Sequence, residues 1–548
     1  MAALDPIIGN LGLKNAAHLL RRATFGPTRS EIIEFSNYDA NQALNALLLP
    51  LTPPNPPIDP LTGEDWLPKP ITEVNSGDST LFICYKAWFM ELMRTSGTTL
   101  RERMVYFYHT HLPVDFNIVS DSTAIYYQNA LYRFYALGNF KELLTKTCVD
   151  NAMLVYIDNT LNDVDSPNEN FAREMLELYS IGKGEQIGPE DYTNYTEDDV
   201  KQAARVLTGI KHNNDFDSID PDTGLPRGKV TLDTNNMAIR HDAGTKTFSS
   251  KFGGTVISPN PVSGGLTTEQ GFFDEISAMM DMIFAQAETA KFICRKLYRF
   301  FVYYEITPEI ETSIIEPLSA TFINNNYDIV PVLRQLLMSE HFYDADNIIG
   351  SDDNIGALIK SPLEIMVGLL RYFKLAFPSD IETLYKVYNP SLLRDLNDQG
   401  MSFYEPIDVA GYPPYHQEPV YNRNWITANW LANRYLCITR LLDGIKDENE
   451  NIILQLNTPN FVKDTNNISD PSNASTLVSE LVNSLFPADI PAERFNYFLN
   501  TKFLENADPA SWTSLWNAYI GGAPETDVKA YLDRLITGLC QSPEFQLF

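Results

Sequence analysis

The sequence predicts a mainly α, multi-helix globular fold with a small β or loop insertion around residues 213–260. Three observations predict it. Apolar residues recur at helical spacing on both sides of the middle segment, Gly, Pro and Asn punctuate these stretches, and short β-prone runs gather in the middle. The 548 residues are 44% hydrophobic and 20% charged, which is typical of folded globular proteins.

The first part of the chain is predicted to be helical. Apolar spacing predicts a helix over residues 13–22, and a capping box of Thr28 and Glu31 opens a second one. A third helix stops at Pro50, where the proline-rich residues 50–70 predict an extended connection. Aromatic-rich helices are then predicted over these ranges: 80–95, 99–111, 122–137 and 140–148.

The next two helices have clear end signals. Ser166 and Glu169 form a capping-box pattern before a predicted helix over residues 167–181, which Gly182 ends. Thr196 and Asp199 predict a helix from about residue 197 to 208. Short β-prone runs follow at 229–232, 246–252 and 255–258. Helices return from residue 269, including 289–304, 328–339, 361–373, 424–442 and 527–541.

This order divides the sequence into three segments. Residues 1–212 form an N-terminal helical lobe with the candidate site helices, and residues 213–268 form a Gly- and Asp-rich loop or small β element. Residues 269–548 form a C-terminal helical lobe. No internal repeat of fixed period is visible.

Charge and cysteine content restrict the function classes. With 41 Lys and Arg against 71 Asp and Glu, the net charge is −30, so we expect no nucleic-acid partner. No window approaches the roughly 18 uncharged residues of a membrane span. The N-terminus shows no signal peptide, which predicts a cytoplasmic protein, or an exported one if a leader has been removed. The five cysteines lie far apart and are expected to be buried, without disulfides.

Seven strings in order along the chain resemble one bacterial family, the domain of unknown function 1800. They are residues 17–28, 109–111, 168–174, 195–200, 241–246, 360–364 and 542–545. The resemblance implies a mostly helical domain that is continuous over residues 1–548. It also implies a partner from the domain of unknown function 1501 family, which is similar to the alkaline-phosphatase and sulfatase superfamily. Many relatives have His where this chain has Tyr179.

Two pairs of residues suggest a metal site. His109 and His111 would share a face in an extended segment, whereas in a helix they point about 200° apart. Glu174 and Glu177 lie on one stripe of the predicted helix over residues 167–181 and suit acid–base work or a divalent metal ion of unknown identity. The alternative is structural: histidines packed among aromatic rings, and glutamates paired with Arg173.

Two further features carry candidate residues. His241 and Asp242 lie in the Gly-rich middle segment, where loops often present catalytic groups. An aromatic group late in the chain suits a carbohydrate, a peptide or ordinary packing; it comprises Tyr412, Tyr415, Tyr421, Trp425 and Trp430. The nucleophile-elbow and phosphate-loop patterns of hydrolases and nucleotide-binding proteins are absent from the sequence.

The sequence therefore leads to one functional hypothesis and one alternative. The hypothesis is a metal-assisted enzyme, either hydrolase-like or redox-active at the same ligands. Its metal ligands are His109, His111, Glu174 and Glu177, and its catalytic groups are Glu174, Glu177, His241 and Asp242. The alternative is a non-enzymatic scaffold or assembly protein in which these polar residues hold helices together. Homo-oligomerisation is left open.

Overall fold

A computed structural model describes residues 3–67, 77–260, 262–346 and 354–548 of the chain. It confirms the predicted fold class, since 55% of the residues are helical and 8% lie in strands. Of the proline-rich connection predicted over residues 50–70, residues 68–70 lie outside the described ranges.

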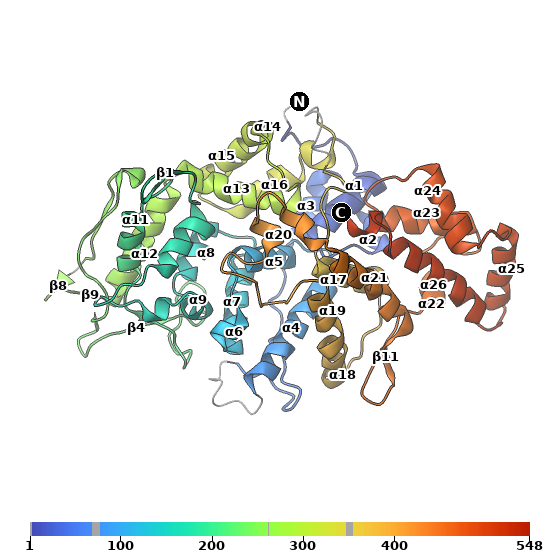
Figure 1. Cartoon of the computed structure of the whole chain (residues 1–548), viewed down its shortest axis with the longest axis horizontal. Helices are drawn as coiled ribbons and strands as arrows, with labels where there is room; N and C mark the ends of the chain where they lie inside the picture. Colours follow the sequence, from blue (N-terminus) through green and yellow to red (C-terminus); the bar gives the residue numbers. More distant parts are fainter. Residues whose placement is uncertain (1–2, 68–76, 261, 347–353) are drawn as a thin grey trace.

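The N-terminal part is a succession of helices (Figure 1). They are α1 (Gly12–Ala23), α2 (Arg29–Phe35), α3 (Ala40–Leu47), α4 (Asp78–Thr95), α5 (Arg101–His111), α6 (Phe116–Val119), α7 (Ser122–Phe134), α8 (Phe140–Thr147), α9 (Asn151–Tyr156), α10 (Asn170–Glu174) and α11 (Glu197–Val206). The predicted capping boxes at Thr28 and Thr196 are confirmed, because both side chains accept a hydrogen bond from the backbone three residues on.

The strands are short and antiparallel. They are β1 (Gln186–Gly188), β2 (Asp191–Tyr192), β3 (Ile210–Lys211), β4 (Lys229–Val230), β5 (Met237–Ala238), β6 (Lys246–Thr247), β7 (Val256–Ile257), β8 (Val262–Ser263), β9 (Leu266–Thr268), β10 (Ile445–Lys446) and β11 (Ile452–Leu454). They pair as β1–β2, β3–β4, β5–β9–β8, β6–β7 and β10–β11. The first and last of these pairs lie outside the predicted insertion, because runs of two or three residues are too short to show strand alternation.

Helices continue through the rest of the chain. They are α12 (Glu269–Phe284), α13 (Ala287–Phe301), α14 (Pro308–Ile310), α15 (Glu316–Asn324), α16 (Ile329–Leu337), α17 (Pro362–Tyr372), α18 (Ile381–Lys386), α19 (Leu393–Asp398), α20 (Pro413–His416), α21 (Ala428–Asp443), α22 (Thr458–Lys463), α23 (Ala474–Leu485), α24 (Ala492–Asn496), α25 (Pro509–Ile520) and α26 (Thr526–Cys540). The 3₁₀ helix η8 (Tyr421–Trp425) follows α20 directly.

For the helix predicted over residues 167–181, the predicted start at residue 167 is wrong. Helix α10 begins at Asn170, where the Asn168 side chain accepts a hydrogen bond from the Asn170 backbone N–H. After Glu174 the helix widens into a π-helix, η3 (Met175–Ser180). The Ser180 hydroxyl donates to the carbonyl oxygen of Met175, five residues earlier. A π-turn spaces residues differently from an α-turn, so the stripe predicted from α-helical spacing does not continue past Glu174.

Buried apolar side chains form one connected core that extends from Leu11 to Phe545. Packing crosses the predicted segment boundaries, because α12 contacts α8 and α11, and α17 contacts α4. In Figure 1, α11 and α12 lie at one end of the molecule, α25 lies at the other, and α5 and α20 lie near the centre. The centre is therefore where segments from distant parts of the sequence meet.

The ends of the chain are packed near this centre. The imidazole Nε2 of His18 on α1 is 2.9 Å from the carbonyl oxygen of Phe342. Arg22 donates to the carbonyl oxygen of Asn354 at 2.6 Å, and its guanidinium lies 4.7 Å from the ring centroid of Phe548. Figure 1 places the C-terminus beside α1. The first long helix is thus stabilised by residues more than three hundred positions away.

The five cysteines are all free and buried. Burial raises the pKa of both Cys84 and Cys540 to about 12, which keeps these thiols protonated and unreactive. None of the helices in the described residues is both long enough and apolar enough to span a membrane.

Candidate functional site

His109 and His111 lie in the last turn of α5 and contact different neighbours. The Nε2 atom of His109 is 3.4 Å from the Tyr412 hydroxyl, whereas the Nε2 atom of His111 is 3.1 Å from the backbone oxygen of Tyr179. Burial lowers the pKa of each histidine to about 3, so both imidazoles are neutral near pH 7. Because the segment is helical, the two rings do not form the chelating pair expected of an extended segment.

Glu174 and Glu177 lie on either side of the change from α-helix to π-helix. Glu177 accepts hydrogen bonds from the Lys183 ammonium at 3.3 Å and from the Tyr195 hydroxyl at 3.2 Å. Burial and the negative charge of Glu177 raise the pKa of Glu174 to about 7. Glu174 is therefore the carboxylate of this pair that can hold a proton near neutral pH.

This raised pKa predicts a pH-dependent stability. Between its ordinary value of 4.5 and about 7, Glu174 keeps a proton in the folded chain that the unfolded chain has released. Stability contributed by this group therefore falls as pH rises through that window. The Glu174 side chain is only half-buried, so solvent screening reduces the effect of its raised pKa. Relative to Glu174→Gln, the native chain should lose about 1 kcal/mol of unfolding free energy between about pH 5 and pH 8.

Urea unfolding at the two pH values measures this difference. The exposed Glu185→Gln is the matched control and should follow the native chain at both pH values. If Glu174→Gln also shows the native pH dependence, Glu174 is ionised in the folded protein throughout this range, which would contradict the prediction.

His241 belongs to a buried ion cluster with Lys246 and Glu275. The Nδ1 atom of His241 is 3.0 Å from the carbonyl oxygen of Thr208, and its Nε2 atom hydrogen-bonds the Glu275 carboxylate. Lys246 donates to both oxygens of Glu275 at 2.8 Å, and the side chains of His241, Lys246 and Glu275 are at most 1% exposed. The cluster joins the middle segment to α12.

Asp242 is held separately by Arg205 of α11. The Arg205 guanidinium donates to the Asp242 carboxylate at 2.6 Å. Burial alone would raise the pKa of Asp242, but hydrogen bonds from Arg205 and from the Gly244 backbone hold it below its usual value. Asp242 therefore does not orient the ring of His241.

The six residues predicted as a site are thus distributed over several separate contacts. Within residues 3–67, 77–260, 262–346 and 354–548, no three His, Cys, Asp or Glu side chains gather as ligands of one metal ion. Metal binding by His109, His111, Glu174 and Glu177 stays a prediction from the sequence, as does catalysis by His241 and Asp242.

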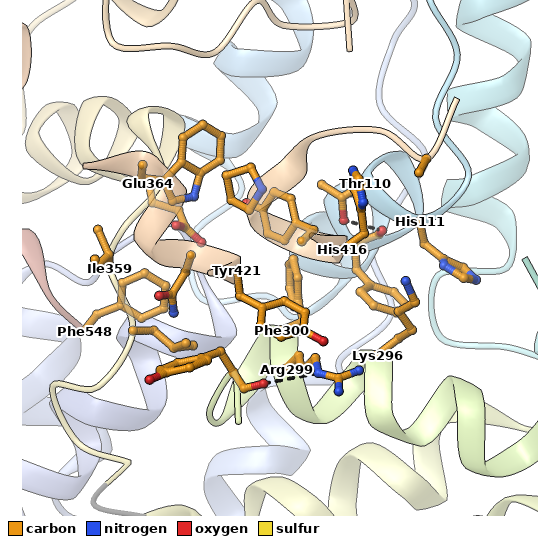
Figure 2. Close-up of a pocket in the computed structure, with 18 of the residues that line it drawn as sticks. Thr110, His111, Lys296, Arg299, Phe300, Ile359, Glu364, His416, Tyr421 and Phe548 are labelled. Carbon is orange, nitrogen blue, oxygen red and sulfur yellow. Dashed lines mark hydrogen bonds between the residues drawn. The ribbon is translucent and has the colours of Figure 1, made fainter. Parts of the chain in front are cut away.

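A central pocket of about 760 Å³, counted with its open mouth, lies where α5, α13, α17, α20 and η8 meet (Figure 2). Of the residues predicted as a site, His111 lines it. The aromatic group noted in the sequence contributes Tyr415, Tyr421 and Trp425 to its wall. The remaining two members of that group, Tyr412 and Trp430, line a neighbouring cavity that shares Trp425.

Two positive charges reach the pocket from α13. Lys296 and Arg299 are three residues apart, so they lie on the same face of the helix. The Arg299 Nε donates to the carbonyl oxygen of Tyr304 at 3.2 Å, and its guanidinium carbon lies 4.8 Å from the ring centroid of Tyr421. Figure 2 shows Lys296 and His416 on one side of the pocket and Glu364 on the other.

The negative charge in the pocket wall is already neutralised. Glu364 forms an ion pair with Arg103, whose side chain is 1% exposed, and accepts a hydrogen bond from the Ser361 backbone. The nearest carboxylate oxygen to Arg299 belongs to Glu418, at 3.7 Å, and that side chain is 73% exposed. The charged side chains that line the pocket, Lys296, Arg299 and Glu364, therefore sum to a positive charge within a chain of net charge −30.

Among the described residues, both amide atoms of Asn422 and one imidazole nitrogen of His416 in the pocket wall have no hydrogen bond. Asn422 is 8% exposed, and neither its amide nitrogen nor its amide oxygen has a hydrogen-bond partner in the part of the chain that the structure describes. The Nε2 atom of His416 is also buried without a hydrogen bond among these residues, 3.6 Å from a carboxylate oxygen of Asp408. Both groups can therefore interact with a molecule in the pocket.

Sequence reasoning missed Lys296, Arg299, His416, Asn422 and Glu364 as site residues. Lys296 and Arg299 were missed because they lie on the polar face of the amphipathic helix α13. Lys and Arg are common at such positions, so the sequence pattern does not mark them as site residues. The signal that pointed to this region was the concentration of Tyr and Trp after residue 411.

Comparison with known proteins gives a family. A family model described as protein of unknown function (DUF1800) matches residues 18–547, which is nearly the whole chain. No curated protein and no solved structure matches. The family description assigns no activity, so the function has to be inferred from the pocket itself.

Proposed function

The chain belongs to the DUF1800 family of proteins of unknown function, and we propose that it binds a small anionic molecule in the central pocket. The ligand would carry an anionic group, a neutral hydrogen-bonding group and a flat apolar part. Each of these groups matches one part of the pocket wall.

The positive charges of Lys296 and Arg299 support the anionic group of the ligand. Among the described residues, the Lys296 ammonium has no carboxylate within ion-pair distance, and Arg299 has only the distant, exposed Glu418. A partly buried cation without a close counter-ion is costly, and an anionic ligand supplies the missing charge. Arg299 also offers several N–H donors in a fixed plane, which suits a carboxylate or phosphate.

The unpaired amide of Asn422 supports the neutral hydrogen-bonding group, and it is the observation that carries the proposal. A buried amide with neither donor nor acceptor satisfied costs about 1–3 kcal/mol for each group left without a partner. A ligand amide or hydroxyl would satisfy both atoms of the side chain at once. Native proteins pair nearly all such buried groups, so an unpaired amide in a pocket wall supports a ligand with a matching donor and acceptor.

The apolar part is argued from the aromatic wall. Trp425 is 2% exposed, and the rings of Tyr415 and Phe300 lie 6.0 Å apart beside it. Aromatic walls with a few placed polar groups are typical of small-molecule sites. A ring or a flat hydrocarbon part of the ligand would lie against them.

N-benzoylglycine combines a carboxylate, an amide and an aromatic ring, and it is the probe for this proposal. Isothermal titration of the full chain should show saturable binding with a Kd between about 1 μM and 1 mM. Arg299→Ala should weaken binding about tenfold or more, because it removes the charged donors, and Asn422→Ala should weaken it about fivefold.

Lys291→Ala is the matched control. Lys291 lies on the same helix, pairs with Glu316 at 2.7 Å and does not line the pocket, so its removal lowers the net charge without changing the pocket wall. Binding should be unchanged in this variant. Absence of saturable binding up to about 10 mM, or equal binding by all four proteins, would reject the proposal.

A further inference from the structure

We propose that Lys296 is a nucleophile that forms an imine with the carbonyl group of an oxo acid in the central pocket. The inference rests on the proposed function, since the anionic group of the oxo acid is the group that the pocket would bind. It adds a covalent step and a substrate class: small carboxylates with a ketone or aldehyde next to the anionic group.

The position of Lys296 makes its amine available to a ligand. The side chain lines the pocket, and its ammonium nitrogen lies 5.3 Å from the ring centroid of Phe292. In the described part of the chain no carboxylate lies within 4.0 Å of this nitrogen, in contrast to Lys246, which Glu275 holds at 2.8 Å. An amine that is not fixed in an ion pair can turn toward a bound carbonyl carbon.

The surroundings of Lys296 also favour the reactive form of the amine. Burial, followed by the positive charge of Arg299, lowers the pKa of Lys296 to about 8. About one tenth of the amine is therefore neutral near pH 7, against less than about one thousandth for an exposed lysine. Lysines desolvated beside another cation are a known way to prepare this nucleophile.

His416 can carry the protons that the reaction must move. It lines the same pocket, and its buried Nε2 atom has no hydrogen bond among the described residues. Burial lowers its pKa; Asp408 opposes this shift, and the charge of Lys296 adds to it. A neutral imidazole can accept a proton from the attacking amine and return it to a leaving hydroxyl group.

The step balances without an oxidant or reductant. The neutral nitrogen of Lys296 attacks the carbonyl carbon, the C=O π electrons move to oxygen, and the proton that nitrogen loses passes through His416 to that oxygen. In the resulting carbinolamine, His416 accepts the second N–H proton of the nitrogen and passes it to the hydroxyl group, which leaves as water. The nitrogen electron pair then forms the C=N bond, so the products are a neutral imine and one water molecule. Arg299 holds the carboxylate of the oxo acid beside the reacting carbon.

Phenylglyoxylate is the probe, because it has the ring and carboxylate of N-benzoylglycine but a reactive ketone. Incubation of the full chain with phenylglyoxylate and cyanoborohydride, which donates hydride to an imine carbon, should leave a reduced adduct. Peptide mass mapping should place that adduct on Lys296 at least about tenfold faster than on Lys291 of the same helix. N-benzoylglycine should slow the trapping by competition.

Two variants and one binding measurement separate the outcomes. Lys296→Arg keeps the positive charge but has no amine that can form an imine, so it should lose the adduct, and His416→Asn should slow its formation. If phenylglyoxylate binds the native chain but no adduct forms at Lys296, the imine proposal is overturned and the binding proposal stands. If neither anion binds, both proposals fail.

Discussion

Replacing Glu275 by alanine is expected to lower the free energy of unfolding by about 3–5 kcal/mol. Its carboxylate is 1% exposed and is the shared acceptor for Lys246 and His241. Without it, the Lys246 ammonium, which is 0% exposed, keeps a single acceptor among the described residues, the Asp242 carbonyl oxygen. An uncompensated buried charge of this kind is among the largest single-site losses known in proteins.

Urea unfolding of Glu275→Ala measures the loss. Asp274→Ala is the matched control, since Asp274 is the exposed neighbour on the same helix, and it should change stability by less than about 0.5 kcal/mol. Combining Glu275→Leu with Lys246→Met removes both charges and should recover a large part of the loss. A loss below about 1 kcal/mol for Glu275→Ala would show that water reaches the cluster.

Replacing Arg103 by methionine is expected to cost about 3–5 kcal/mol for a related reason. Arg103 neutralises Glu364, whose side chain is 9% exposed, and donates to the carbonyl oxygen of Arg22 at 3.0 Å. Its guanidinium carbon also lies 4.6 Å from the ring centroid of Phe300. The change would leave an unpaired carboxylate in the wall of the central pocket, so binding of N-benzoylglycine should weaken as well.

The neighbouring Arg101→Met is the control for this variant. Arg101 lies on the same helix, but no carboxylate among the described residues lies within ion-pair distance of it, so the expected loss is below about 1 kcal/mol. Adding Glu364→Gln to Arg103→Met should restore about 1–2 kcal/mol. If Glu364→Gln restores nothing, the loss in Arg103→Met comes from packing and not from the unpaired charge of Glu364.

The helices were predictable where local chemistry decides them. Thr28 and Thr196 cap helices in the structure. Each side-chain oxygen accepts a hydrogen bond from the backbone N–H three residues on, and groups this close in sequence meet without help from distant residues. Ser166 carries the same pattern, yet the helix begins at Asn170, because residues 163 and 166 pair with each other instead. Tertiary packing decided between two local arrangements there, and a sequence pattern does not contain that information.

The candidate site was less predictable because its residues come from distant helices. The sequence brought attention to His111 and to the aromatic residues after position 411, but α13 contributes Lys296 and α17 contributes Glu364. Which polar residue of an amphipathic helix lines a pocket depends on the crossing of helices that are hundreds of residues apart. Glu275 was missed for a different reason: a lone carboxylate within a helix does not reveal that Lys246 and His241 meet it.

The attachment of α1 to distant segments has a consequence for synthesis in the cell. Helix α1 leaves the ribosome early, but its partners lie far along the chain: Arg21 donates to the carbonyl oxygen of Ser484 at 2.8 Å, and His18 contacts that of Phe342. At about 5–20 residues per second, roughly 20–90 s pass before residue 484 is made. During that time α1 can pack on early elements such as α2, but the part of its surface that faces these late segments stays uncovered. The nascent chain should therefore depend on a holding chaperone, and folding should finish only after translation has passed this point.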